Sequence, residues 1–363
     1  MNVIIIGAGV IGSAIAYYLS LRGIEATVIE CCKPACAASG KSGGFLARDW
    51  CIGQPQDNLA QLSFDLHSDL SETLNTDYGY RRIDTYGMTL SDRHPDSNGN
   101  RINIYPNWLD NEGTVQQILG NLATTAQLDP EMFTFALLNA ACVMGAQIKN
   151  GTVTSIERDP IRERVTGVTV GGVFQPADAV VVAMGPWSLH ATNWIPLPRV
   201  YGLKGYSITL SPTSPVTAAA LFLDYEDHNG ERHGPELITR ANGEVYLCGF
   251  SSNDRLPQSP DRVSVDYSAC DDLHNLAKRI STVFADSTIV RRQACYRPIC
   301  KDAMPLIGEI QGTQGAYVAT GHNCWGILNA PGTGLALSEL LSDGKTHSID
   351  LTPFSPRRLS ALC

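Results

Sequence analysis

Residues 2–12 read N-V-I-I-I-G-A-G-V-I-G, and this stretch decides the fold of the first part of the chain. The β-branched run before the first glycine is typical of a strand buried on both faces. Residues 13–19 follow with helical spacing, Gly23 ends that helix, and a second apolar strand over 26–29 ends at Glu30. Strand, G-x-G-x-x-G turn, helix and strand together predict a βαβ unit that binds a dinucleotide.

Each glycine of this turn has its own role in holding a diphosphate. Gly7 permits the tight turn, Gly9 lets the diphosphate approach the backbone, and Gly12 lets helix and strand pack closely. The first amides of the helix then face the diphosphate. Glu30 stands where an acidic side chain accepts hydrogen bonds from the adenosine ribose. The cofactor contacts predicted here are Gly7, Gly9, Val10, Ile11, Gly12 and Glu30.

The composition is that of an ordinary globular protein. The chain has 363 residues, of which 44% are hydrophobic and 17% charged, and this length predicts two domains. The net charge is −9 and no basic block occurs, which argues against a nucleic-acid partner because phosphates are neutralised by Lys and Arg. No apolar run reaches the roughly 18 residues that suggest a membrane span, so none is expected.

The cysteines indicate a reducing compartment. Eleven of them, an odd number, are scattered through a long chain, whereas a secreted disulfide scaffold is short and its cysteines pair. Cys31, Cys32 and Cys36 lack a matching Cys/His pair downstream, so we interpret them as packed thiols and expect no metal site. The apolar amino terminus lacks the positively charged region of a signal peptide, which predicts a cytoplasmic protein.

Further sheet signals occur late in the chain and favour FAD over a nicotinamide cofactor. A nicotinamide dehydrogenase usually completes its cofactor domain in one continuous stretch. Here a buried strand over 177–184 closes on a glycine turn at 185–188, and another strand spans 315–321. The glycines at 332–334 are predicted to open a helix over 335–341. The amides at its start would stabilise the anionic end of a flavin ring.

Six motifs carry a resemblance to a known family. They are the G-x-G-x-x-G turn with Glu30, A-S-G-K-S-G-G-F at 38–45, L-D-P at 128–130, V-V-V-A-M-G-P-W-S at 180–188, R-P-x-x-x-D-x-x-P-x-x-G at 297–308 and G-H-x-x-W-G at 321–326. In these residues, and in their order, the chain resembles the FAD-dependent D-amino-acid oxidase family, especially its glycine/sarcosine oxidase-like branch. The first motif is common to many flavoproteins, and the last two are much more specific.

The resemblance implies an α/β flavoprotein of two domains. A discontinuous Rossmann-like FAD-binding domain would combine residues 1–80, 120–200 and 296–363, and an antiparallel-sheet substrate domain would combine 81–119 and 201–295. Local signals agree with this division, since Asp129, Pro130 and Glu131 have the pattern of a helix start. The stretch 86–115 is rich in Asp, Asn and Gly and is predicted to form surface loops.

The resemblance and the turn motifs also imply further cofactor contacts. The loop from Ser39 to Gly44 would supply backbone amides and a hydroxyl to the diphosphate and the flavin. Lys41 would add positive charge there, unless it is an ordinary surface lysine. The full set beyond the first turn is Ser39, Gly40, Lys41, Ser42, Gly43, Gly44, Val153, Gly185, Trp187, Gly321, Gly326, Gly332, Thr333 and Gly334.

The implied chemistry is the transfer of a hydride from a Cα–H bond of a small amine or amino acid to flavin N5, giving an imine that water hydrolyses. The cofactor supplies this redox chemistry, so no carboxylate pair or Ser/His/Asp triad is needed. Arg297 is the candidate anchor for a substrate carboxylate, because guanidinium binds carboxylate bidentately. Its alternative role is a salt bridge between domains. His322 and Trp325 fall where the family has loop residues near the flavin, and packing in the core would equally explain them.

Two departures from the family's pattern, and one further match to sarcosine oxidases, change the expectations. Glu236 stands where glycine oxidases have a substrate-contacting tyrosine. Facing the flavin, it would attract a second amine on the substrate; otherwise it is an exposed acid at a strand start. The oxygen-activating lysine of monomeric sarcosine oxidases has no counterpart near 246–249, so electrons pass either to O2 or to another acceptor. Cys295 has the spacing of the flavin-linked cysteine of sarcosine oxidases, which makes a covalent link the alternative to the expected non-covalent FAD.

Two functions from different classes follow from these residues. One is an FAD-dependent oxidase or dehydrogenase of a small amine or amino acid. The other is a flavin-binding assembly or chaperone-like factor that keeps the fold without turnover, because fold does not dictate function. A nicotinamide-only dehydrogenase would leave the motifs at 297–308 and 321–326 unexplained.

Overall fold

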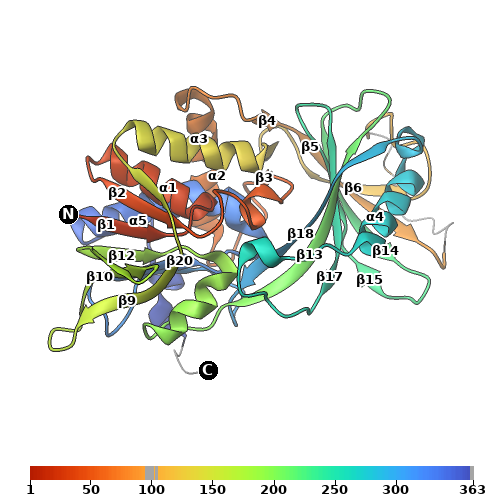
Figure 1. Cartoon of the computed structure of the whole chain (residues 1–363). Coiled ribbons are helices and arrows are strands. Elements are labelled where there is room, and N and C mark those ends of the chain that lie inside the picture. Colours follow the sequence, from red (N-terminus) through yellow and green to blue (C-terminus); the bar gives the residue numbers. More distant parts are fainter. Residues whose placement is uncertain (95–101, 103–104, 360–363) are drawn as a thin grey trace.

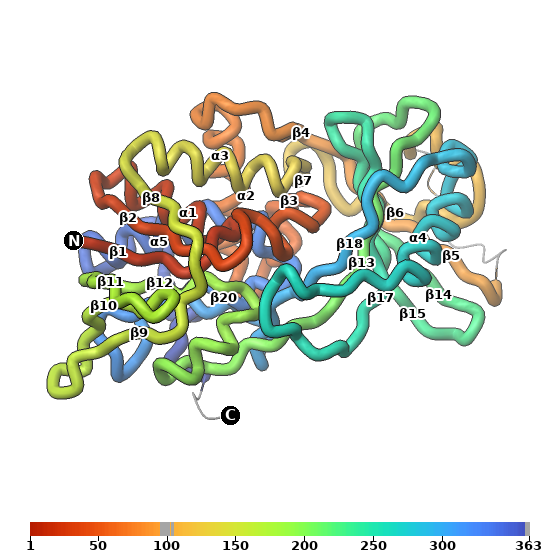
Figure 2. The backbone as a smooth tube through the Cα atoms, in the orientation of Figure 1, coloured from red at the N-terminus to blue at the C-terminus, as the bar shows by residue number. Residues whose placement is uncertain are grey.

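The computed structural model describes residues 1–94, 102 and 105–359, which form two parts side by side (Figure 1). One part is a sheet covered by helices and holds both the first and the last of the described residues, 1 and 359. The other is a larger, mostly antiparallel sheet with one helix on its outer face. The backbone passes between the parts several times, so each is built from separated segments (Figure 2). This is the α/β architecture that the resemblance implies.

The first part is built on a six-stranded sheet in the order β19-β20-β12-β1-β2-β8. All neighbouring strands in it are parallel except the pair β19 and β20. The predicted βαβ unit lies at its centre and is confirmed. The strands are β1 (Val3–Ile6), β2 (Ala26–Glu30), β8 (Gln147–Asn150), β12 (Ala179–Val182), β19 (Leu306–Glu309) and β20 (Ala316–Thr320).

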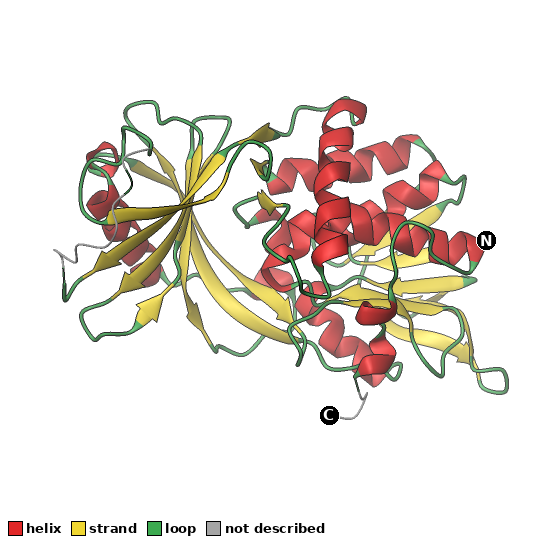
Figure 3. Ribbon diagram, turned by 180° about the vertical axis from the view of Figure 1, so that it is seen from behind, coloured by secondary structure: helices red, strands yellow, loops and turns green. Residues whose placement is uncertain are grey.

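Side chains of the central strand β1 alternate between two cores. Val3 and Ile5 pack in the core shared with the helices. Ile4 and Ile6 pack in a second core that a three-stranded antiparallel sheet closes from the other face. The helices are α1 (Val10–Leu21), α2 (Asp57–Thr73), α3 (Pro130–Val143) and α5 (Gly326–Asp343), and the small sheet is β9 (Val153–Asp159), β10 (Arg164–Val170) and β11 (Val173–Pro176). Figure 3 shows the helices from behind.

Helix α5 begins nine residues earlier than predicted, at Gly326 instead of residue 335. Pro331 lies inside it, and a proline there removes one backbone donor and leaves the carbonyl of Ile327 without its helical partner. Nε2 of His67 on α2 lies 3.0 Å from that carbonyl oxygen and supplies the missing donor. The amide of Gly332 in turn donates to Ser63 Oγ at 3.2 Å. The helix therefore continues through the proline because α2 satisfies the groups that it releases.

The second part is an eight-stranded sheet in the order β18-β13-β17-β16-β14-β5-β6, with β15 paired to β14. Only β5 and β14 are parallel neighbours. One face packs on α4 (Tyr267–Ile280), and the other faces the first part. The strands are β5 (Asp84–Ser91), β6 (Thr114–Gly120), β13 (Tyr201–Ser211), β14 (Ala219–Glu226), β15 (Arg232–His233), β16 (Glu236–Thr239), β17 (Val245–Ser252) and β18 (Thr288–Ile299).

The prediction of surface loops over 86–115 is partly wrong. Residues 84–91 form strand β5, which pairs with β14 on one side and β6 on the other. Its side chains alternate between the two faces of the sheet, and Met88 and Leu90 are buried in the core on the face that packs against α4. Residues 95–101 and 103–104 of the same region lie outside the described residues.

A fourth sheet, of three short strands, joins the two parts, and several 3-10 helices lie in the loops. The sheet has the order β3-β7-β4, with β3 (Phe45–Ala47), β4 (Arg81–Arg82) and β7 (Thr125–Gln127). The 3-10 helices are η1 (Ala38–Gly40), η2 (Gly185–Asn193), η3 (Pro260–Arg262), η4 (Thr282–Phe284), η5 (Asn323–Trp325), η6 (Thr352–Phe354) and η7 (Pro356–Arg358). Within the described part of the chain, no helix combines the length and apolarity needed to cross a membrane.

The buried histidine beside Pro331 makes stability depend on pH. Burial lowers the pKa of His67 to about 4, so the native side chain stays neutral while the unfolded one takes up a proton below its ordinary value of 6.5. The unfolded state thus binds more protons between pH 4 and 6.5, and the free energy of unfolding falls as the pH is lowered through that window, by about 1.4 kcal/mol per pH unit for this group. Denaturant unfolding from pH 4.5 to 7.5 measures the slope.

His67→Gln keeps a donor for the Ile327 carbonyl but does not titrate, and it should lower the slope by about one proton. His67→Leu removes both the donor and the titrating group. It should lower the slope in the same way and should also lower the free energy of unfolding by roughly 1–3 kcal/mol at pH 7, because a buried carbonyl is left unpaired. An unchanged slope in both variants would contradict the assignment.

Candidate active site

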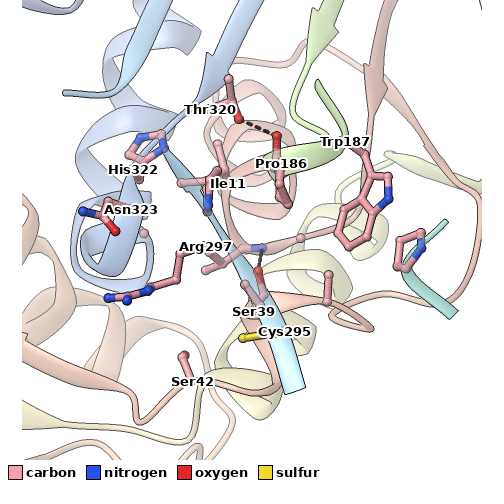
Figure 4. Close-up of a pocket in the computed structure, with 18 of the residues that line it drawn as sticks. Ile11, Ser39, Ser42, Pro186, Trp187, Cys295, Arg297, Thr320, His322 and Asn323 are labelled. Carbon is pink, nitrogen blue, oxygen red and sulfur yellow. Dashed lines mark hydrogen bonds between the residues drawn. The ribbon is translucent and has the colours of Figure 1, made fainter. Parts of the chain in front are cut away.

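A cavity of about 1230 Å³ lies between the helix-covered sheet and the eight-stranded sheet. The dinucleotide turn and the residues around Glu30 line one end. The cavity face of the eight-stranded sheet, called the roof below, lines the other, with side chains from β13, β14, β16, β17 and β18. The loop between β20 and α5 closes the side, as Figure 4 shows for His322 and Asn323.

The glycines of the turn are required by close approaches of the backbone. Gly7 has φ +108°, and a Cβ there would lie 2.5 Å from the carbonyl oxygen of Ala183. A Cβ on Gly12 would lie 2.0 Å from the carbonyl oxygen of Gly7. At Gly9 the nearest atom would be Ser39 Oγ at 3.1 Å, so this glycine leaves its space open to the cavity. The turn has the form that lets a diphosphate reach the backbone.

Glu30 is fixed at the far end of the cavity. Its side chain is buried, and its two carboxylate oxygens accept hydrogen bonds from the amides of Ala8 at 2.8 Å and Cys32 at 2.9 Å. The Cys31 thiol also donates to Oε1, at 3.5 Å. The two carboxylate oxygens have about four acceptor positions, so one remains for a ribose hydroxyl, and a second where that hydroxyl replaces the weak thiol donor. This arrangement fits the adenosine half of FAD.

The loop 41–44 is fastened to the roof by three hydrogen bonds. Tyr246 donates its hydroxyl to the Lys41 carbonyl at 3.1 Å, and Lys41 Nζ donates to the Ala294 carbonyl at 3.2 Å. The Arg240 guanidinium donates to the Ser42 carbonyl at 3.2 Å. Lys41 is therefore not an ordinary surface lysine, but its ammonium group is directed to the roof. The Ser42 hydroxyl lines the cavity, is buried and has no protein partner, which suits a cofactor contact.

The roof places Glu236, Cys248, Cys295 and Arg297 on the cavity. Arg297 is half-buried, and the one hydrogen bond of its guanidinium among the described residues is to Ser251 Oγ, at 3.4 Å. Figure 4 shows this side chain extending from β18 to the side of the cavity where His322 and Asn323 lie. Glu236 is half-buried rather than exposed, and it is one of the residues that line the cavity.

The loop that follows β20 holds His322 as a neutral side chain. His322 is 3% exposed, and its Nε2 lies 3.1 Å from Thr333 Oγ1 of α5. Burial lowers the pKa of His322 to about 3, so the ring carries no charge at neutral pH. Asn323 beside it has φ +51°, and its Oδ1 is buried in the cavity wall without a protein partner. The loop thus offers polar atoms to a ligand but no charge.

An aromatic wall was missed by the sequence analysis. It consists of Phe45, Trp50, Phe222 and Trp325, whose neighbouring ring centroids lie 4.7–6.1 Å apart, mostly edge to face. All four line the cavity, yet they come from three separate parts of the chain. Trp325 thus combines both of its predicted roles, because it packs against aromatic neighbours and also borders the cavity. No local motif signals such a wall, because it forms only when the roof meets the loops.

The cavity collects most, but not all, of the predicted cofactor residues. Those that line it are Gly7, Gly9, Val10, Ile11, Glu30, Ser39, Ser42, Gly43, Gly44, Val153, Gly185, Trp187 and Gly326. Gly12, Gly40, Lys41, Gly321, Gly332, Thr333 and Gly334 are not among the described lining residues. The last three lie within α5, where a Cβ on Gly334 would meet α1 backbone at 2.7 Å. The glycines there allow close helix packing, and the helix start that borders the cavity is Gly326.

The amino-acid sequence matches the family model described as "FAD dependent oxidoreductase" over residues 2–340. A candidate oxidoreductase of Schizosaccharomyces pombe is 30% identical, over 98% of this chain and 97% of its own. Glycine oxidase of Geobacillus kaustophilus is 26% identical, over 98% and 97%. The crystal structure of a glycine oxidase from that bacterium superposes with a TM-score of 0.78 at 23% identity, covering 98% of both chains. Iminodiacetate oxidase of Chelativorans gives a TM-score of 0.78 at 19% identity, again covering 98% of both.

Replacement of Glu30 tests the nucleotide end of the cavity. Glu30→Gln keeps the size of the side chain but removes its charge and one of its acceptor oxygens, so hydrogen bonds to ribose weaken. We expect the Kd of the apoprotein for FAD to rise about tenfold, equivalent to roughly 1.4 kcal/mol. Fluorescence titration with FAD measures it, with Glu72→Gln on the exposed face of α2 as the control. An unchanged Kd would mean that Glu30 holds the backbone at Ala8 and Cys32 but does not bind the ribose.

Proposed function

The chain belongs to the family of FAD-dependent oxidoreductases, and we propose that this enzyme oxidises the C–N bond of a small amine or amino acid to an imine, which water hydrolyses. When bound, FAD accepts the hydride that leaves the substrate carbon. The names of the relatives support this substrate class, since they include a glycine oxidase and an iminodiacetate oxidase.

The observation that carries the proposal is the unpaired guanidinium of Arg297. It lines the cavity, and among the described residues no carboxylate oxygen lies within 4.0 Å of it. A domain-to-domain salt bridge, the other interpretation of this residue, is therefore not what the side chain makes. Guanidinium is charged at all ordinary pH values and binds carboxylate bidentately, so we propose that Arg297 holds the substrate carboxylate.

The aromatic wall suits the rest of a small substrate. Phe45, Trp50, Phe222 and Trp325 exclude water from their side of the cavity and present apolar surface to the carbon skeleton. We propose that the carboxylate on Arg297 and the skeleton on this wall together orient the reacting Cα–H bond. Among the described lining residues there is no lysine, so the proposal includes both O2, with release of H2O2, and another electron acceptor.

The test is the visible absorption spectrum of the purified protein, recorded without oxygen while small amino acids are added. We expect a flavin spectrum that bleaches with at least one of them. Arg297→Ala should raise KM for carboxylated substrates by 100-fold or more, because a charge-assisted bidentate contact worth roughly 3 kcal/mol is lost. Arg291→Ala, on an exposed position of the same strand, is the matched control.

Three outcomes would count against the proposal in different ways. An unchanged KM in Arg297→Ala would show that the carboxylate binds elsewhere. A flavin that no amine bleaches would favour the assembly or chaperone-like function. A protein that cannot bind FAD would contradict the family assignment itself. Oxygen consumption after anaerobic bleaching then identifies the acceptor.

We further propose that FAD is bound without a covalent link. Cys295 lines the cavity, but burial raises the pKa of its thiol, which keeps it protonated, and a thiol reacts as a nucleophile only when it is deprotonated. Acid precipitation should therefore release all the flavin as intact FAD. Flavin that stays with the precipitated wild type but not with Cys295→Ser would show that the link exists.

A further inference from the structure

Glu236 and Arg297 carry opposite charges on the same roof without forming an ion pair. They lie on β16 and β18, with β17 and β13 between them. Within the described residues, Arg297 makes no ion pair within 4.0 Å, yet its charge is near enough to oppose the effect of burial on Glu236. Both side chains contact the same strand, since Arg297 donates to Ser251 and the Cys248 thiol donates to Glu236, and Cys248 and Ser251 lie three residues apart on β17. Both also line the same cavity, which is the space that a ligand would share.

Arg297 is also the charged group whose positive charge lowers the pKa of Glu236, against the effect of burial. The other titratable groups that interact with Glu236 are Cys248 and Tyr246 on β17 and Cys324 on the loop before α5. Burial raises the pKa of all three, to about 11 for Cys324, so they are neutral at pH 7. The Cys248 thiol lies 3.8 Å from Glu236 Oε2, positioned as a weak donor to it. Arg232 of β15 also lines the cavity, but it is exposed and paired with Asp224 at 2.9 Å. Arg297 and Glu236 thus offer one positive and one negative charge that are not paired in this way, as a zwitterion requires.

The reaction proposed above needs an uncharged amine, because only a free nitrogen lone pair can stabilise the carbon that loses hydride. The pKa of an alkyl ammonium group lies about three units above pH 7, so roughly one substrate molecule in a thousand arrives with an uncharged amine. Of the other carboxylates that line the cavity, Glu30 is held at the nucleotide end by two amides, and Asp261 is exposed. His322 stays neutral. Among the described lining residues, Glu236 is therefore the carboxylate that is neither held by backbone amides nor exposed, and it can take up this proton.

We propose that Glu236 accepts the proton of the substrate ammonium while Arg297 holds the carboxylate. The N–H bond breaks, its electron pair stays on nitrogen, and the proton forms an O–H bond on the Glu236 carboxyl. The proton then leaves to water when product is released, so no other reactant is consumed. Burial raises the pKa of Glu236, which makes it a better acceptor than an exposed carboxylate. This assignment rests on the proposed function and gives Glu236 a catalytic role.

The first test follows anaerobic flavin reduction by racemic alanine and racemic lysine as a function of pH. In the wild-type holoenzyme the rate should stay level from pH 6.5 to 9. In Glu236→Gln the rate should fall about 100-fold at pH 7 and rise about tenfold per pH unit. The reason is that the substrate ammonium must then lose its proton to the solvent. Glu236→Asp, which keeps a carboxylate, should restore the level profile, and Glu231→Gln on the exposed neighbouring hairpin should not change it.

Other results would overturn the assignment. A profile in Glu236→Gln that matches the wild type, or a loss that is equal at every pH, would leave Glu236 without a proton-accepting role. A loss confined to lysine would show instead that it binds a second amine. If neither amino acid reduces the wild-type flavin, the proposed function has failed for these substrates, and the second test still examines Glu236.

The second test needs no turnover and uses acetate, which has a carboxylate but no ammonium. Acetate on Arg297 would bring a second negative charge beside Glu236, so the enzyme should take up as much as one proton from the buffer at pH 7. Calorimetry in two buffers of different ionisation enthalpy measures this proton. If Glu236→Gln still binds acetate but takes up no proton, the proposal is supported. The same uptake in that variant contradicts it, and loss of acetate binding in the Arg297→Ala variant shows that the two charges share one site.

Discussion

The cavity depends on the hydrogen bonds that fasten loop 41–44 to the roof. Tyr246, Arg240 and Lys41 supply the three donors, and each accepting group is a backbone carbonyl. Arg240 is 5% exposed and lies 3.6 Å from Asp129 at the start of α3, so its charge is compensated where it is buried. A buried donor that loses its acceptor costs about 1–3 kcal/mol, and this cost resists separation of the two parts. The glycines of the same loop permit the contact, since a Cβ on Gly43 would lie 2.5 Å from Ile238 of the roof.

Local patterns were enough to predict the cofactor end, because its requirements are local. Gly7, Gly9, Gly12 and Glu30 lie within one βαβ unit, and each follows from backbone geometry over a few residues. The start of α5 was not predictable in the same way. Pro331 and its neighbouring glycines indicate a break in any isolated helix, and only His67 and Ser63, more than 260 residues earlier, allow the helix to continue.

The roof shows why substrate contacts were harder to predict than cofactor contacts. Successive residues of a strand point to opposite faces, so an error of one residue in register exchanges the core for the cavity. Leu237 and Leu247 pack under α4, whereas Glu236 and Cys248 face the cavity. The sequence around 236 therefore allowed both an exposed acid and a site residue. The pairing of Glu236 with Cys248 across β16 and β17 decides between them.

The same alternation explains how such a fold can change its substrate without losing stability. The side chains under α4 supply the apolar core of the second part, and the cofactor end is built largely from backbone. On the cavity face of the roof, Ile238 and Tyr246 pack in a small core of their own, whereas Arg297 and Glu236 belong to neither core. Within the described part of the chain, the one hydrogen bond of the Arg297 guanidinium is to Ser251, and that of the Glu236 carboxylate is from the Cys248 thiol. A substitution there alters the charge that meets a substrate at small cost to folding, because few packed neighbours must adjust. Glu236 is one such position, since its side chain lines the cavity and lies outside the apolar core under α4.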